Sequence, residues 1–98
     1  MTLTDKQFEV LIEWARGVAR EWGRDMRARY EKKFGEPPVE DEVGGWDEPA
    51  WGEAWKAIRE EDEENGKSGE GDIAALDDDD GDQLYAEARE AFDEAFFA

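Results

Sequence analysis

The chain has 98 residues, and its 29 Asp and Glu outnumber its 12 Lys and Arg, which gives a formal net charge of −17. A field this negative argues against direct contact with nucleic acid or anionic membranes and favours a cationic partner. The absence of His and Cys excludes a thiolate nucleophile, disulfide bonds and zinc sites with nitrogen or sulfur ligands. The sequence contains neither an apolar run of the ~20 residues that a membrane span needs nor a signal-peptide pattern, so we expect a soluble, cytoplasmic protein.

The first predicted helix covers about residues 4–34. Thr4 and Gln7 have the spacing of a capping box, and apolar residues recur after them at steps of three and four. Gly35 and the two prolines behind it end the helix. At ~1.5 Å per residue the helix is about 45 Å long, which is more than a compact chain of this size can cover. We therefore expect either a bend near one of its internal glycines or an exposed end that meets a second copy in a homodimer.

Two shorter helices are predicted downstream, at about residues 47–64 and 82–97. Asp47 is the expected N-cap of the former. The segment between them, about residues 65–81, is rich in Gly and Asp, which predicts a flexible acidic linker. Within it, residues 73–76 form a short apolar island that could dock as one helical turn. The apolar residues of the second helix that we expect in the core are Trp51, Ala54, Trp55 and Ile58.

These elements predict a small all-α protein, with three helices in a single domain over residues 1–98 and with acidic, partly flexible loops. No alternating pattern of β-branched residues indicates a strand. The core depends on aromatic side chains, of which the chain has five Trp, five Phe and two Tyr. Trp22, Phe92 and Phe96 are the clearest core candidates outside the second helix.

The acidity is confined to the part of the chain beyond the first helix. Residues 35–98 hold 23 acidic and 4 basic side chains, whereas residues 1–34 hold 6 acidic and 8 basic ones. Four arginines recur at helical spacing on the first helix, and the simplest interpretation of this basic ridge is that it neutralises the acidic later helices within the fold. The ridge consists of Arg16, Arg20, Arg24 and Arg27.

Catalysis finds little support in this sequence, and we expect no enzymatic activity and no cofactor. With 29 carboxylates, pairs that could act as acid and base arise by chance. Glycine-rich phosphate loops are absent, and the helical Glu-x-x-His pattern of di-iron proteins needs a histidine.

Two segments partly match the calcium loop of an EF-hand. With Gly81 at the sixth position, aspartates fall at positions three, five and seven and Glu87 at twelve, but Leu76 occupies the first position, which requires a carboxylate. With Gly66 at the sixth position, Lys67 and Ser68 do not fit the two positions that follow. Neither loop matches the full pattern, so we predict no metal site and leave weak divalent binding by the Asp-rich segment open.

The acidic surface itself is the remaining candidate for function. Seven acids between Glu48 and Glu64 lie within about 24 Å of helix, or one per about 3.4 Å, which equals the charge spacing along one strand of DNA. Trp46, next to this helix, is a candidate aromatic anchor in a protein interface. The acidic candidates for partner binding are Glu53, Glu60, Glu61, Asp62, Glu63 and Glu64 on the second helix, with Asp77, Asp78, Asp79, Asp80 and Asp82 beside the third.

In size, charge and lack of catalytic residues the chain resembles the small acidic inhibitors that phages and mobile elements use against restriction enzymes and CRISPR effector complexes. The resemblance is one of composition over the whole chain and depends on no motif. It implies an inhibitor that occupies the basic nucleic-acid-binding surface of a host defence enzyme as a mimic of DNA.

Two alternatives stay open. One is an immunity or antitoxin-like protein that neutralises a cationic toxin, with its acidic face steering a fast encounter. The other is a structural or assembly protein without a nucleic-acid enzyme as partner, dimeric through the first helix, in which the acidity serves only solubility.

Overall fold

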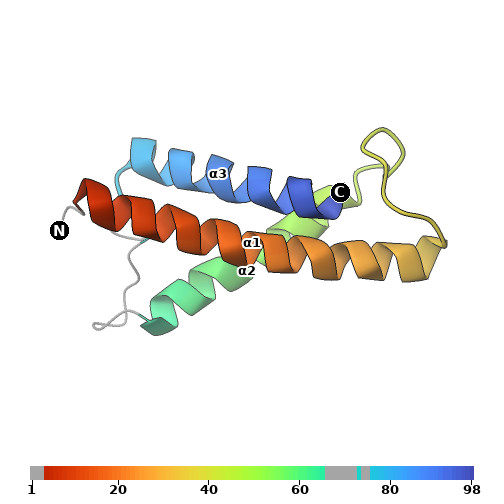
Figure 1. Ribbon diagram of the computed structural model, residues 1–98, viewed down its shortest axis with the longest axis horizontal. Helices are drawn as coiled ribbons and strands as arrows, with labels where there is room; N and C mark the ends of the chain where they lie inside the picture. The colour runs from red at the N-terminus through yellow and green to blue at the C-terminus, as the bar shows by residue number, and fades with distance from the viewer. Residues whose placement is uncertain (1–3, 66–72, 74–75) are drawn as a thin grey trace.

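The computed structural model describes residues 4–65, 73 and 76–98. These residues form three helices, α1 (Asp5–Phe34), α2 (Asp47–Asn65) and α3 (Asp78–Phe96), and none of them lies in a strand. The all-α prediction is therefore confirmed. α1 and α3 run side by side in the same direction, and α2 crosses α1 obliquely in the opposite direction (Figure 1).

α1 is one unbroken helix that sets the length of the molecule. Thr4 and Gln7 form the expected capping box, and Gly35 ends the helix in the left-handed conformation at φ 78°. The molecule measures 47 × 22 × 18 Å, and α1 runs along nearly all of its long axis (Figure 1). Of the two outcomes expected for so long a helix, the bend does not occur. The end of α1 extends past α3, and the segment 35–46 folds back beside it (Figure 1).

A line of small residues brings α1 and α3 close together. Ala15, Ala19 and Gly23 follow one another at four-residue steps and are all buried. A Cβ atom on Gly23 would lie 2.6 Å from the backbone oxygen of Phe92 and 2.9 Å from the Cβ of Ala95. Only glycine therefore permits this approach, and the position is a packing contact, not a hinge.

Long aromatic side chains fill the space between α2 and α3. The Trp51 ring lies 5.4 Å from both the Phe92 ring and the Tyr85 ring, and its indole nitrogen donates a hydrogen bond of 2.7 Å to the Tyr85 hydroxyl. The Trp55 ring lies 5.0 Å from that of Tyr85. Trp51, Ala54 and Ile58 are buried, and Trp55 is half-buried against the same core, as the periodicity predicts. Phe92 and Phe96 are fully buried, and Trp22 is half-buried against the same core.

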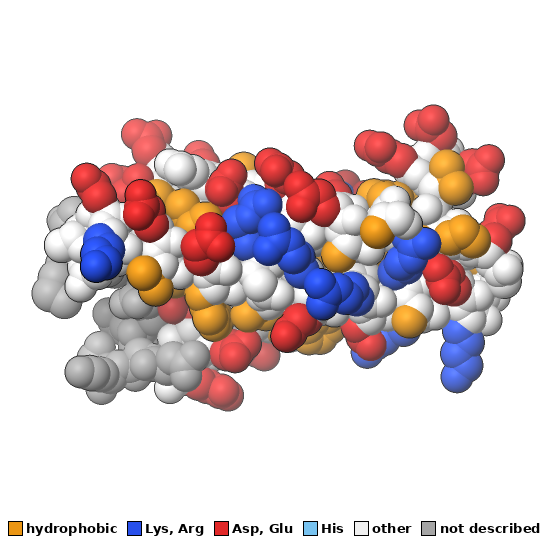
Figure 2. All heavy atoms as spheres, in the orientation of Figure 1, with side chains coloured by type: hydrophobic (Ala, Val, Ile, Leu, Met, Phe, Trp, Pro, Cys, Tyr) orange, Lys and Arg blue, Asp and Glu red, His pale blue; other side chains and the backbone are white. Residues whose placement is uncertain are grey.

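The basic ridge largely does what the sequence predicts. Arg16 donates to the backbone oxygen of Glu87 at 3.1 Å and lies within 4 Å of three carboxylates on α3, one of which it shares with Arg20. Arg27 donates to the carbonyl oxygens of Phe96 and Ala98 at the end of α3. Arg24 is exposed and forms no ion pair within the described residues. Figure 2 shows this basic band across the middle of the molecule, with acidic side chains on both sides of it.

The start of α3 differs from the prediction. The helix begins at Asp78 and not near residue 82, because the Asp77 side chain caps it by accepting the Asp80 N–H at 2.8 Å. Acidic residues in a first turn are favoured by the positive end of the helix dipole, and Gly81 is accommodated within the helix. The predicted linker, about residues 65–81, is thus helical at both of its described ends, and residues 66–72 and 74–75 lie outside the described residues.

Two further details concern the ends of the connections. Ile73 and Leu76 are half-buried against the core and are joined by a turn hydrogen bond of 3.2 Å, in line with the docked apolar island that the sequence predicts. Asp47 is the first residue of α2, but Arg89 binds its carboxylate at 2.8 Å, so this side chain joins two helices where we expected an N-cap.

Candidate protein-binding surface

The outer face of α2 carries five of the six acidic residues predicted on this helix in exposed positions. The buried side of the helix follows Ala54, Ile58 and Asp62 at four-residue steps, and the acidic residues between them lie on the exposed side. The exposed acidic residues of this helix beyond its first turn are Glu53, Glu60, Glu61, Glu63 and Glu64.

Asp62 is the exception among the predicted residues on α2. Its side chain lies on the buried face, where the residue is 7 % exposed, and its Oδ2 accepts the backbone N–H of Ile73 at 3.0 Å. The carboxylate thus holds Ile73 against α2 and adds little to the outer surface. The four-residue step from Ile58 is a signal in the sequence that could have placed it inward.

The predicted aspartates of α3 lie at its N-terminal end. Asp77, Asp78, Asp79 and Asp82 are exposed, and Asp80 is half-buried. Asp77 has a clear structural role as the cap, and the first-turn aspartates stabilise the positive end of the helix dipole. These residues lie at the same end of the molecule as the end of α2, with the start of α1 between them (Figure 1).

The carboxylates of the fold divide into paired and unpaired groups by position. Within the described residues, those that form ion pairs lie on α1, in the first turn of α2 and in the second half of α3. The predicted residues other than Asp62 form no ion pair with any described residue. The fold therefore pairs several acids along its middle with arginines, and it leaves the predicted residues at one end, like the acids of the segment 35–46 at the other, without ion pairs to described residues.

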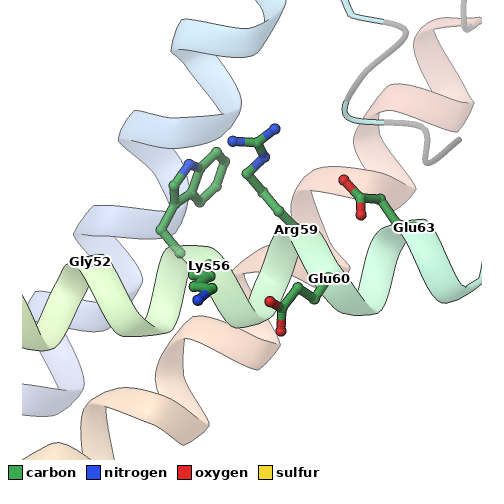
Figure 3. A pocket seen from close by; sticks show the side chains of 6 residues that line it. Gly52, Lys56, Arg59, Glu60 and Glu63 are labelled. Atoms are coloured by element: carbon green, nitrogen blue, oxygen red, sulfur yellow. The ribbon is translucent and has the colours of Figure 1, made fainter.

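Two cations interrupt the acidic face of α2. Arg59 and Glu63 project from one side of the helix and Lys56 and Glu60 from another, each cation one turn before a glutamate (Figure 3). Neither cation lies within 4 Å of a described carboxylate. Together with Gly52 and Trp55, these four residues line a shallow hollow of about 300 Å³. The two positive charges offset part of the face near Glu60 and Glu63, and Glu61 and Glu64 have no cation one turn before them on the helix.

Trp46 is part of the packing at the other end of the molecule. Its ring stacks on Phe96 with centroids 5.8 Å apart and planes 8° apart, and it meets the edge of Tyr30 at 5.3 Å. The ring is half-buried, and it closes the core where α1 extends past α3. Tyr85, which we did not predict as a binding residue, is more exposed than Trp46, at 42 %.

Arg89 organises a second group of charges that sequence reasoning did not find. Its guanidinium binds Asp93 on its own helix at 3.0 Å and Asp47 on α2 at 2.8 Å, and it lies 5.7 Å from the centre of the Trp51 ring. Burial raises the pKa of the Asp93 carboxyl above its usual value of 3.8; the charge and hydrogen bond of Arg89 oppose the shift, and Asp47 and Glu48 add to it. Desolvation of the Asp93 carboxylate thus outweighs the stabilising effect of the arginine.

The described residues contain no cluster of three or more carboxylates arranged to hold a metal ion. The EF-hand match around Gly81 fails because Asp78 to Glu87 form a continuous helix, which cannot wrap around a cation as the loop does. The match around Gly66 lies mainly outside the described residues. Among the helices that the structure describes, none is both long enough and apolar enough to cross a bilayer.

Comparison of the chain with protein-family models, with curated protein sequences and with solved structures gave no match. The function is therefore argued from the distribution of charge and exposed side chains alone.

Proposed function

We propose that this protein is an acidic inhibitor that binds the basic nucleic-acid-binding surface of an enzyme as a mimic of DNA. In this proposal the protein performs no chemistry of its own, and its partner is a defence enzyme of the CRISPR effector or restriction type. The inhibitor is then a product of a phage or mobile element and acts in the cytoplasm of the host.

The observation that carries the proposal is the group of unpaired carboxylates at one end of the molecule. Glu60, Glu61, Glu63 and Glu64 are exposed on a helix and lie within about 6 Å of helix rise. This is one charge per about 1.5 Å, close to the spacing of one per about 1.7 Å along duplex DNA. Charges held on a helix need little ordering on binding, and their approach displaces the anions that screen a basic channel.

The acids of α3 extend this surface across the end of the molecule. Asp78, Asp79 and Asp82 are exposed on a separate helix, so carboxylates are presented from two directions, as phosphates are from the two strands of a duplex. Asp77, which caps the helix, is also exposed at this end.

The test compares two triple variants with the same change in net charge. Glu60→Gln/Glu61→Gln/Glu64→Gln removes three unpaired charges from α2, and Glu36→Gln/Asp41→Asn/Glu42→Gln removes three exposed charges from the segment between α1 and α2, at the other end of the molecule (Figure 1). Tagged wild-type protein is used to capture partners from host lysate, which are eluted with salt or with duplex DNA. The captured enzyme is then purified for binding measurements.

We expect a nucleic-acid enzyme that duplex DNA displaces, with affinity that falls steeply with salt. The α2 variant should lose at least about tenfold in association rate at low salt, and the control variant much less. Equal effects of the two variants, or a partner that DNA does not displace, would contradict the mimic and favour the immunity-protein or assembly alternatives.

A further inference from the structure

A groove of about 590 Å³ lies between α3 and the segment that joins α1 to α2. Apolar surface from Tyr85, Ala86 and Phe97 forms much of its lining. Carboxylates surround this surface on both sides, from the connecting segment and from α3. The acidic residues that line the groove are Glu40, Glu90, Asp93 and Glu94.

The basic residue that lines the groove, Arg89, is already occupied. Its guanidinium is held by Asp93 at 3.0 Å and by Asp47 at 2.8 Å, with Glu48 at 3.5 Å. The other carboxylates are less well compensated. Glu40 has no ion pair with a described residue, and Glu90 and Glu94 reach Arg16 and Arg20 only at 3.9 Å.

Tyr85 gives the groove a fixed aromatic wall. Its ring is held edge-on by Trp51 at 5.4 Å and Trp55 at 5.0 Å, and its hydroxyl accepts the indole N–H of Trp51. The residue is nevertheless 42 % exposed, which is unusual for a ring with so many contacts. An aromatic face beside carboxylates attracts a cation by both charge and the ring quadrupole.

We propose that this groove binds an arginine side chain presented by a partner protein. An arginine has an apolar stem for the surface of Tyr85 and Ala86, and a planar guanidinium that stacks on tyrosine and pairs with a carboxylate such as Glu90, one turn after Ala86. Lysine has the same charge but a strongly hydrated, non-planar head, so it fits the aromatic wall less well. A role of the groove in the partner complex rests on the proposed function, since basic nucleic-acid channels are rich in arginine. Binding of an arginine side chain to the groove does not depend on the proposed function.

The first experiment uses N-acetyl-arginine methylamide as a probe, with the lysine and leucine analogues for comparison. Amide ¹⁵N–¹H spectra of the full chain are recorded during titration at physiological salt. We expect saturable shifts at Tyr85, Ala86 and Glu90, smaller ones with the lysine analogue and none with the leucine analogue. Equal binding of arginine and lysine, or shifts that spread equally over the acidic end of α2, would show a diffuse ion atmosphere and overturn the proposal.

A matched pair of variants tests the position of the site. Ala86→Lys places a cation inside the groove, and Ala28→Lys makes the same change at an exposed position of α1 that does not line it. The former should weaken binding of the arginine probe about tenfold and the latter should leave it unchanged. If Ala86→Lys fails to fold by circular dichroism, Glu90→Gln, one turn after Ala86, replaces it, with a smaller expected loss. Identical affinities for the groove variant and the control would refute the site.

The same variants separate this inference from the proposed function. If the α2 triple variant loses the captured enzyme but Ala86→Lys retains it, the groove has no role in the complex and the mimic stands. If the probe binds the groove but no DNA-displaced enzyme is captured, the groove stands and the mimic fails.

Discussion

Gly23 illustrates how a single residue sets the spacing of two helices. A Cβ atom there would meet the Phe92 carbonyl oxygen at 2.6 Å, a backbone atom that cannot move without shifting α3. At Gly17, two turns earlier on the same helix, a Cβ atom would meet nothing within 4 Å.

These two glycines therefore predict opposite effects of the same substitution. Gly17→Ala should stabilise the protein by up to about 1 kcal/mol, because alanine is the better helix former. Gly23→Ala should destabilise it by about 1–3 kcal/mol through overpacking, in spite of the same gain in helix propensity. Urea denaturation of both variants measures the difference. A Gly23→Ala variant as stable as Gly17→Ala would show that the helices are not packed as closely as described.

Asp93 makes a pH-dependent contribution to stability that is opposite to that of a carboxylate in a favourable ion pair. Because its pKa is raised in the folded protein, the folded state binds the proton more tightly than the unfolded chain does. Its contribution is therefore fully present below pH 3.8 and is lost as the pH rises through the folded pKa. Relative to Asp93→Asn, the wild-type protein should gain stability as the pH falls from 7 towards 4. Denaturation curves of both proteins between pH 7 and pH 4 test the sign of this difference in stability. A wild type that becomes less stable relative to Asp93→Asn as the pH falls would contradict the prediction.

At the scale of the elements, local signals predicted α1 best. The capping box at Thr4 and the terminating Gly35 are short-range features, and both helix ends follow from them. The predicted start of α3 was wrong because a run of aspartates is typical of a solvated linker. In this protein the run supplies the N-cap and the first turn of the helix. Sequence reasoning included Asp62 in the surface because it counted charge along the helix without following the buried face.

The arrangement of the groove could not be predicted at this level. Glu40 and Phe97 are far apart in the sequence, and they meet only because the connection after α1 returns along α3. The pairing of Arg89 with Asp47 likewise depends on how α2 crosses the other helices. No periodicity and no motif in the sequence indicates either of these contacts. The sequence therefore indicated the acidic face of α2 but not the groove beside α3.

The N-cap of α3 allows a prediction about the stability of this helix. Asp77→Ala removes the side-chain cap of the Asp80 N–H and should lower the free energy of unfolding by about 1 kcal/mol. Asp77→Asn keeps an N-cap of similar quality while removing the charge, so its stability should stay close to that of the wild type. Thermal denaturation of both variants distinguishes the cap from the charge. Equal losses in the two variants would assign the effect to charge alone.

At the scale of the whole molecule, the net charge of −17 opposes folding. The Debye length falls from about 30 Å at 0.01 M salt to well under 10 Å at 0.5 M, so the repulsion between unpaired acids is screened across most of the 47 Å length. We expect the Tm to rise over this range, although the ion pairs of Arg16 weaken in the same salt. Scanning calorimetry in NaCl and in KCl tests this, the two salts serving as controls for specific ion effects. A Tm that falls with salt would mean that the ion pairs outweigh the repulsion.

The aromatic contacts between α2 and α3 give the protein an optical property of its own. Trp51 and Trp55 lie 5.8 Å apart with their planes at 32°, and Tyr85 stands nearly perpendicular to both. Rings this close and fixed at an angle couple their electronic transitions, which gives a circular-dichroism signal that isolated rings lack. Because the Tyr85 contacts exist only while α2 and α3 stay together, changes in this signal would follow the docking of α2, without a label, during unfolding and on binding of a partner.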